Sequence, residues 1–450
     1  MTTGTASRSR GRRLRENSIG IGSSTAIGIA STAPAYSLAV SVGLLVAYVG
    51  GAAPWLLAAA AIPVVLVALC FRELNRAEPD CGTTFAWSEK AFGLGTGRMV
   101  GWITVMACVL VMSNLAQVAA IYTYSLVGLD GLAGSRLAQA GLGSIFIGVM
   151  AYLAYRGVRI AARTQVILVT IELAALLWFS VNAFIEAGSL SIPTSTGEGS
   201  WAAAFLVAIF LYWGWDSSFS INEESVEPGR TPAIGALLTN AVLIVVYVVV
   251  AWAAVAYAGV DQLAGVGEDD FFATLTDDLL GSAGGKLLVG AVLVSALAST
   301  QTTILPTART MLSMARRDAF PGQFARISAR YQTPSVSTWA FAAASTLIYV
   351  VLVLTSDAVL ADSVAAISVL VSLYYVATAV AVPLYFRGML RERLLQRVIV
   401  PVVAAVSFAV VLVLAVLDVG TGPLVVVAVS VVVGAAIMFS MKPHVEENSA

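Results

Sequence analysis

The sequence predicts an all-α, polytopic membrane protein with twelve transmembrane helices. Hydrophobic residues make up 59% of the 450 positions, charged residues make up only 11%, and the mean hydropathy is +0.88. Soluble domains carry roughly 25% charged residues, so this chain lacks the charge to cover a water-facing surface. Its apolar residues form continuous runs of about 20, the length of a helical bilayer crossing. Continuous runs exclude barrel strands, in which apolar and polar residues alternate.

Twelve apolar runs are the predicted spans, and each is bounded by Gly, Pro or charged residues. In chain order they cover residues 20–48, 55–73, 99–127, 137–155, 160–186, 201–220, 233–259, 285–308, 335–355, 361–386, 398–417 and 421–441. The longest predicted loops are 74–98 and 309–333 on one side and 260–284 on the other. Segments of this length are too short to fold alone.

Lys and Arg lie almost entirely on one side of this arrangement. They cluster before the first span and after the second, fourth, sixth, eighth, tenth and twelfth spans. Of the 25 basic residues, 23 fall on that side, and only Arg136 and Lys286 fall on the other. Cytoplasmic loops carry the excess of Lys and Arg. We therefore expect a multi-pass protein of the plasma (inner) membrane with both termini cytoplasmic, which agrees with an even number of spans.

Composition and motifs disfavour several other function classes. The net charge of −1 argues against a nucleic-acid binder, which shows a basic surface. The single histidine, His444, lies in the C-terminal tail, and the three cysteines have no metal-type spacing. Gly284-Gly285-Lys286 lacks the Ser or Thr that follows a phosphate-loop lysine. We expect no metal, no cofactor and no enzymatic activity.

Two acidic residues lie within predicted spans. Glu172 is in the middle of the fifth span and Asp216 is in the latter half of the sixth, with no Lys, Arg or His at comparable depth. Intramembrane carboxylates are costly and usually mark ion or substrate pathways. Burial favours their neutral form, so each is a candidate proton-binding group. The alternative is a protonated carboxyl that is simply hydrogen-bonded to a neighbouring helix.

Two spans are interrupted near their middle. The first contains Pro34 after a run of small residues, and the sixth contains Gly214 between two tryptophans. Such breaks are tolerated in lipid where the freed backbone groups line a cavity or bond to neighbours. A matched pair of broken helices, each opening a set of five, indicates a transporter site between two repeats. A proline kink and a packing glycine are the alternative explanation.

This pairing predicts the organisation of the chain. A cytoplasmic tail covers residues 1–19, the first repeat 20–187, the second repeat 201–387, the last two spans 398–441, and a second cytoplasmic tail 442–450. Because five is an odd number, the second repeat must run inverted relative to the first.

A few polar residues within spans are further candidates. Asn114 in the third span faces either a cavity or a neighbouring helix with which it forms a hydrogen bond. Ser299 and Thr300 in the eighth span either offer hydroxyl ligands to an ion or bond back to their own helix.

Three stretches resemble the amino acid–polyamine–organocation permease family, in the family's order and across spans one to ten. Residues 308–338 read ARTMLSMARRDAFPGQFARISARYQTPSVST, which is similar to the family signature after the eighth helix. Residues 71–93, FRELNRAEPDCGTTFAWSEKAFG, resemble the loop between helices two and three. Residues 212–235, YWGWDSSFSINEESVEPGRTPAIG, resemble helix six with its trailing Glu-Glu and Pro-Arg-x-x-P pattern.

The resemblance implies a five-plus-five inverted repeat, the LeuT-like arrangement, with two extra C-terminal helices. It also implies uptake or exchange of amino acids or related amines. The family binds substrate at the broken centres of helices one and six, which map onto Ala30, Ser31, Thr32 and Ala33 and onto Tyr212, Trp213, Gly214 and Trp215. A substrate carboxylate would face half-helix N-termini, and an ammonium would face the exposed carbonyls.

The chain departs from the family pattern at two places. Residues 30–32 are Ala-Ser-Thr, where the family often has Gly-x-Gly. Glu172 stands where proton-coupled members often carry a lysine, which itself replaces a sodium ion of the related sodium-coupled fold. A glutamate reverses that charge, so it either carries the proton itself or pairs with a cation.

The sequence thus predicts a secondary active transporter for an amino acid or organic amine, working by alternating access and coupled to protons as a symporter. An exchanger without proton coupling is the alternative, and a non-transporting sensor or a channel fits less well. The expected partners are the small-molecule substrate, the proton and membrane lipid. The expected coupling residues are Glu172, Asp216, Ser299 and Thr300, and the expected substrate contacts are the two breaks and Asn114.

Overall fold

The computed structural model describes residues 13–188, 197, 199–267, 271–355, 357–418 and 420–440. These residues fold into α-helices joined by short turns, with no β-strand among them. Most of the two predicted tails, 1–19 and 442–450, lies outside the described residues. The structure therefore confirms the all-α class over the predicted spans.

Helices cover every predicted span. The longer ones are α2 Ile21–Thr32, α3 Pro34–Val49, α4 Ala53–Ala77, α5 Thr84–Phe92, α6 Leu94–Leu126, α8 Arg136–Tyr155, α9 Val158–Ala187, α10 Trp201–Leu211, α12 Thr231–Val266, α13 Phe271–Arg316, α14 Ser335–Thr355, α15 Asp357–Tyr385, α16 Val400–Asp418 and α17 Thr421–Ser440. Two short helices, α7 Asp130–Ala133 and α11 Ser217–Ser220, and a turn of 3-10 helix, η2 Asn222–Glu224, complete the parts used below.

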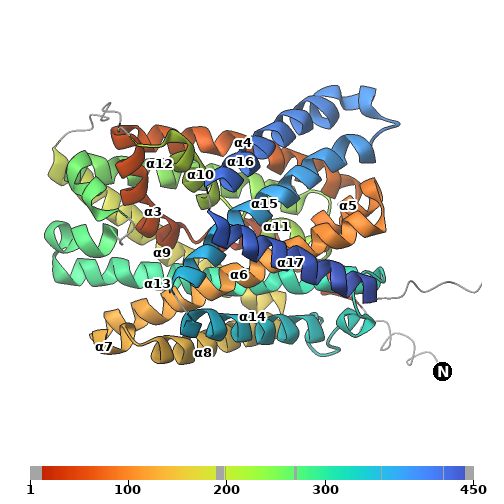
Figure 1. Ribbon diagram of the computed structural model, residues 1–450, viewed down its shortest axis with the longest axis horizontal. Helices are drawn as coiled ribbons and strands as arrows, with labels where there is room; N and C mark the ends of the chain where they lie inside the picture. The colour runs from red at the N-terminus through yellow and green to blue at the C-terminus, as the bar shows by residue number, and fades with distance from the viewer. Residues whose placement is uncertain are drawn as a thin grey trace, which may run out of the picture.

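Nine helical segments in the described ranges are long and apolar enough to cross a bilayer. The first of them, 21–77, contains α2, α3 and α4, whereas α10 and α17 are shorter apolar helices. The long helices lie side by side with similar directions, as expected for a membrane bundle (Figure 1). These features define a polytopic membrane protein.

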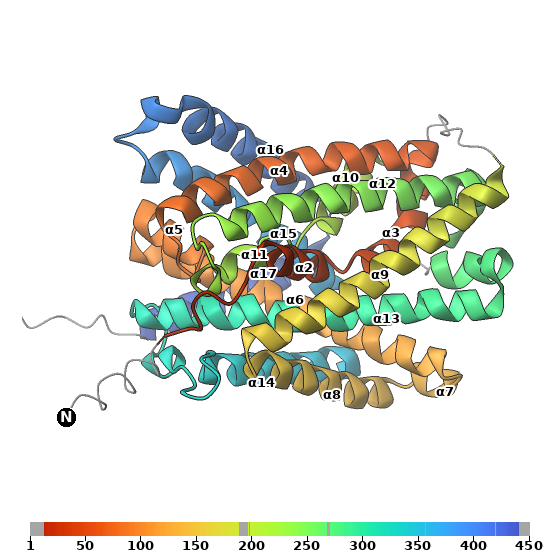
Figure 2. The ribbon, with the colours of Figure 1, turned by 180° about the vertical axis from the view of Figure 1, so that it is seen from behind.

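The interrupted first span lies inside the bundle. Helix α2 packs between α12 and α13 and is crossed by α9, and α3 continues from it along α12 and α13 (Figure 2). At the break, Ala33 adopts a left-handed conformation with φ of +47°. Pro34 then occupies the first turn of α3, where its missing N–H would have had no helical partner. The sequence prediction of a break at Pro34 is confirmed.

The sixth span is also broken, and its break touches the first one. Helix α10 ends at Leu211, and α11 resumes at Ser217. Between them Gly214 has φ of +125°, a conformation that L side chains rarely adopt. A Cβ atom at this position would lie 2.6 Å from the carbonyl carbon and oxygen of Ser31. Gly214 is therefore required for the two breaks to meet.

The prediction that residues 260–284 form an outer loop is wrong for the described residues of that range, most of which are helical. Helix α12 continues to Val266 beyond a turn at Gly259, and α13 begins at Phe271 and turns at Gly281. Both glycines have positive φ, which redirects the chain without ending the helical segments. Phe271 in the second segment is fully buried and packs edge-on against Phe179 of α9.

Cysteine labelling tests the predicted orientation. Thr96 at the start of α6 and Ser282 near the kink of α13 are both exposed, and the orientation places them on opposite sides of the membrane. We expect a membrane-impermeant maleimide to label Ser282→Cys on intact cells, and Thr96→Cys only after permeabilisation. The unmodified chain is the control, because its three cysteines are buried. Labelling of Thr96→Cys on intact cells would contradict the orientation.

Candidate functional site

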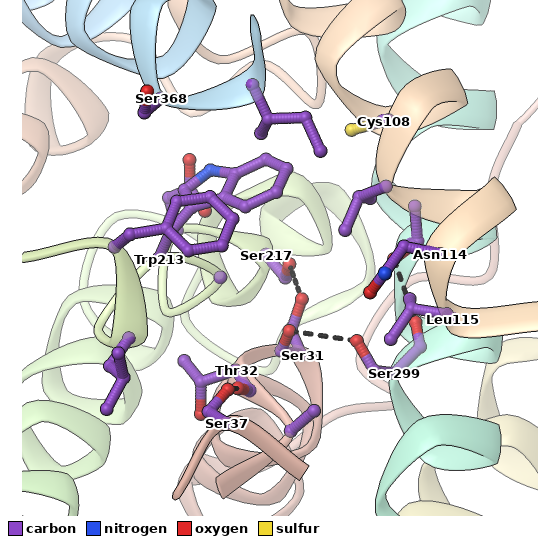
Figure 3. Close-up of a pocket in the computed structure, with 18 of the residues that line it drawn as sticks. Ser31, Thr32, Ser37, Cys108, Asn114, Leu115, Trp213, Ser217, Ser299 and Ser368 are labelled. Atoms are coloured by element: carbon purple, nitrogen blue, oxygen red, sulfur yellow. Dashed lines mark hydrogen bonds between the residues drawn. The ribbon is translucent and has the colours of Figure 1, made fainter. Parts of the chain in front are cut away.

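A cavity of about 340 Å³ lies where the two helix breaks meet. It is bounded by α3, α6, α10, α13 and α15, and Figure 3 shows Asn114 of α6 and Ser299 of α13 across the cavity from Trp213. Eight of the residues predicted from the sequence line it: Ser31, Thr32, Ala33, Asn114, Trp213, Gly214, Asp216 and Ser299. The structure thus brings predicted residues from four separate segments to one space: the first break, α6, the second break and α13.

Five other predicted residues do not line this cavity. Ala30 and Glu172 are buried behind the first break, and the Thr300 hydroxyl bonds back to the Ala296 carbonyl oxygen at 2.8 Å. The Tyr212 hydroxyl donates to the Leu57 carbonyl oxygen at 3.0 Å, so this ring points toward α4. Trp215 also points away, and its ring stacks on Tyr375 with a centroid distance of 5.8 Å.

Hydroxyl groups join the two breaks on the cavity wall. The Ser31 and Ser217 hydroxyl oxygens lie 2.7 Å apart, and the Ser299 hydroxyl donates to the Ser31 carbonyl oxygen at 3.1 Å (Figure 3). Ser31 is therefore bonded to both the sixth span and α13. Ser217 was not predicted from the sequence, where a serine after Asp216 carries no distinguishing signal.

Asp216 ends a chain of hydrogen bonds from the second break to α15. The Trp213 ring N–H donates to the Tyr374 hydroxyl oxygen at 2.5 Å, and that hydroxyl donates to Asp216 Oδ2 at 2.9 Å. A carboxylate has about four acceptor positions, so Asp216 keeps capacity for a ligand donor. The chain fixes the Trp213 ring beside the carboxylate.

Asn114 presents a donor to the cavity. The Tyr36 hydroxyl donates to Asn114 Oδ1 at 2.5 Å, which orients the amide. The side-chain nitrogen of Asn114 is thereby left for a ligand acceptor. None of the described residues that line the cavity is Lys, Arg or His, whereas Asp216 and Asp418 carry carboxylates. The cavity is therefore acidic.

Glu172 binds the start of α3 from behind the cavity. Its Oε1 accepts the backbone N–H of Ala35 at 2.7 Å, and its side chain is fully buried. Oε2 has no hydrogen-bond partner, and Glu172 makes no ion pair with any described residue. The Tyr36 N–H donates to the Ser295 hydroxyl of α13 at 3.3 Å. Glu172 thus links α9 to the broken first span.

Sequence reasoning missed a buried ion pair beyond the cavity. Arg309 was expected in a loop, but α13 continues to Arg316 and buries Arg309, which is 1% exposed. Its Nη2 lies 2.5 Å from Oε2 of Glu224, which is also buried. The pair ties α13 to η2, the turn that follows α11. Its two residues are 85 positions apart, so no local pattern could have paired them.

A second group of ion pairs joins the end of α13 to the segment between α4 and α6. Arg317 contacts Glu78 at 3.0 Å, Asp80 at 2.6 Å and Glu89 at 3.0 Å. All four side chains are partly exposed, between 18% and 24%. By the distribution of Lys and Arg, this is the predicted cytoplasmic side of the cavity.

Asp80, Cys81 and Glu223 lie close enough together to hold a metal ion. Arg316 contacts Glu223 at 2.9 Å and Arg317 contacts Asp80, so both carboxylates are already paired with guanidinium groups. Burial raises the pKa of the Cys81 thiol well above its usual range. Because the thiolate is the metal ligand, this cluster is suited to ion pairing rather than to metal binding.

Comparison with known proteins identifies the family of the chain. The model of the amino acid permease family matches residues 19–441. The chain belongs to that family, which confirms the resemblance inferred from the three sequence stretches.

Individual relatives are distant. The chain is 25% identical over 308 residues to a branched-chain amino acid permease (BcaP) of Bacillus subtilis, which covers 64% of this chain and 65% of the relative. It is 23% identical to a methylthioribose transporter of the same species, covering 62% and 63%. It is 22% identical to a serine/threonine exchanger (SteT) of that species, covering 60% and 61%. The matches thus span less than two thirds of each relative.

The buried pair makes a stability prediction. Glu224→Gln leaves the Arg309 guanidinium buried without its counter-charge, a change that costs about 3–5 kcal/mol. We expect thermal unfolding of the detergent-purified variant at a clearly lower temperature. Replacing both partners, as Arg309→Met with Glu224→Leu, should restore much of the loss, because no lone charge stays buried.

The control for this experiment is Glu227→Gln. Glu227 pairs with Arg230 on the surface, where the two side chains are 61% and 73% exposed. Exposed pairs contribute about 0–1 kcal/mol, so this variant should unfold close to the unmodified protein. An equal decrease of the unfolding temperature in Glu224→Gln and Glu227→Gln would contradict the larger contribution to stability that we assign to the buried pair.

Proposed function

We propose that the chain is a secondary active transporter for an amino acid or related organic amine. The observation that carries the proposal is the acidic cavity at the contact between two broken helices. Secondary transporters use discontinuous helices at a repeat interface to place unsatisfied backbone groups around a solute. A channel would need a continuous pore, and an enzyme would need a convergent set of reactive side chains.

The proposed topology has twelve crossings with both termini cytoplasmic in the plasma membrane. The apolar segment 21–77 supplies two crossings, α2–α3 and α4, and α10–α11 and α17 add to the longer segments. The two breaks then open sets that cover 20–187 and 201–387 and run inverted relative to one another. The last two helices, within 398–441, complete the bundle in contact with membrane lipid.

Residues near both ends of the bundle line the cavity, and this extent supports alternating access. In the proposed orientation, Tyr48 and Asp418 of the lining lie toward the outer side, and Thr83, Thr84 and Thr310 lie toward the cytoplasmic side. Beyond the cytoplasmic end lie the ion pairs of Arg317 with the segment 78–89. We assign this conformation to the state in which the cytoplasmic side is closed.

Proton coupling through Glu172 is part of the proposal. An ionised carboxylate makes a stronger hydrogen bond to an N–H group than a neutral one does. Protonation of Glu172 would weaken its bond to Ala35 and loosen α9 from α3. A coupling group must favour different conformations in its two forms, because a group indifferent to both shifts nothing. The alternative is exchange without proton coupling, and the similarity to a serine/threonine exchanger supports this alternative.

Counterflow tests the carrier function. Purified protein is reconstituted into liposomes that are loaded with unlabelled amino acids or amines, and uptake of a labelled trace is followed. We expect transient accumulation only where the internal solute is a substrate. Equally fast uptake into liposomes that contain no internal solute would indicate a channel. No uptake with any solute would contradict transport.

Glu172→Gln tests the coupling. The amide keeps an oxygen that can accept the Ala35 N–H but cannot ionise, so it imitates the protonated form. We expect loss of accumulation driven by an imposed pH gradient, with counterflow at equal pH largely retained. Asp216→Asn is the companion variant at the other intramembrane carboxylate. Unchanged pH-driven accumulation by Glu172→Gln would make Glu172 structural, and unchanged accumulation in both variants would place the coupling proton on another group. Absence of pH-driven accumulation in the unmodified protein would favour an uncoupled exchanger.

A further inference from the structure

We infer that the cavity binds an organic amine that lacks a carboxylate in preference to an α-amino acid. The inference rests on the proposed function of the cavity and concerns the chemistry of its ligand. Two features carry it: the N–H groups at the first helix break are already bonded within the protein, and the cavity has acidic but no basic side chains.

The start of α3 is a helix N-terminus that would ordinarily attract an anion, because its first N–H groups have no helical partner. Here those groups have internal partners. Pro34 has no N–H, Ala35 donates to Glu172 Oε1 at 2.7 Å, and Tyr36 donates to the Ser295 hydroxyl at 3.3 Å. Glu172 therefore supplies the carboxylate that this helix end would otherwise take from a ligand.

The neighbouring backbone groups complete the same pattern. The Ala33 N–H donates to the Ala30 carbonyl oxygen at 3.2 Å, and the Ser37 N–H donates to the Ala33 carbonyl oxygen at 2.8 Å. An N–H group donates once, whereas a carbonyl oxygen has two lone pairs. The Ser31 carbonyl, which accepts from Ser299, can therefore accept again. Between residues 33 and 37, the break therefore has no free N–H group for a ligand. Its carbonyl oxygens can still accept hydrogen bonds from a ligand.

The side chains of the cavity have the same bias. Among the described side chains of the lining, a carboxylate would find hydroxyl groups and the Asn114 amide as donors, but no guanidinium or ammonium group. It would also lie beside Asp216, and like charges repel most strongly where water is excluded. An ammonium has three donors and no acceptor. It is satisfied by Asp216, by the Ser31 carbonyl and by neighbouring hydroxyls.

Aromatic and aliphatic side chains surround the rest of the cavity. Trp213 is held beside Asp216 by its bond to Tyr374, and Phe210 lies near it with a ring-centroid distance of 5.8 Å. Val111 and Leu115 of α6 also line the cavity. Aromatic faces attract cations and pack against apolar groups. The ligand class is thus a primary amine on an apolar or aliphatic body.

Matched pairs of ligands test this inference directly. Phenethylamine and phenylalanine, isoamylamine and leucine, and putrescine and ornithine each differ only by the carboxylate. Binding of each compound to the purified full-length protein in detergent is measured by calorimetry. We expect the amine to bind about ten-fold or more tightly than its amino acid in at least one pair, because the buried carboxylate lacks a charged partner.

Substitution of Asp216 tests the assigned ammonium partner. Asp216→Asn should weaken binding of the preferred amine by about ten-fold or more, the range for a lost charge-assisted hydrogen bond. Glu186→Gln is the control, since Glu186 is an exposed acid near the end of α9 that does not line the cavity. It should leave amine affinity unchanged. Loss of affinity in the control alone, or in neither variant, would contradict the assignment to Asp216.

The outcomes separate the ligand class from transport. Equal or tighter binding of the amino acid in every pair overturns the inference while leaving the carrier function standing. Binding of putrescine without its counterflow overturns the carrier function and leaves the ligand class standing, because the two charges of putrescine prevent passive leakage. No binding by any of the six compounds overturns the inference as well.

Discussion

Non-helical backbone inside a membrane must have its polar groups satisfied by protein, and the whole site depends on how this chain meets that constraint. The two broken spans meet each other: Gly214 fits against the backbone of Ser31 only because it has no side chain. Ser31, Ser217 and Ser299 then bond across the contact. The cavity is the space left beside this contact, so its position follows from the two breaks and not from a separate binding fold.

Glu172 extends the same constraint to the helices outside the breaks. It satisfies the Ala35 N–H that the break leaves open, and in doing so it joins α9 to α3. A lysine at this position would have repelled the positive end of α3, whereas a carboxylate binds it. The carboxylate of Glu172 therefore determines what the start of α3 can accept from a ligand. Glu172 thus accounts for the proposed proton sensitivity and, together with the acidic lining of the cavity, for the proposed ligand class.

Much of this was predictable from local sequence, and the rest was not. The breaks at Pro34 and Gly214 follow from the backbone chemistry of those two residues, and the buried carboxylates stand out because few charges lie within the spans. Sequence did not separate Trp213, which faces the cavity, from Tyr212, which bonds to Leu57, since a broken helix has no period to assign faces. The Arg309–Glu224 pair could not be predicted from local sequence, because its two residues lie in segments that are far apart along the chain.

The ion pairs beyond the cavity differ in how easily they can separate. Arg309 and Glu224 are almost fully buried, and breaking such a pair costs several kcal/mol. Arg317 and its three partners are partly exposed, and pairs near water contribute far less. A motion that opens the cytoplasmic side would therefore part α13 from the segment 78–89. Because the buried pair joins α13 to η2, we expect α13, η2 and the second helix break to move together as one rigid body.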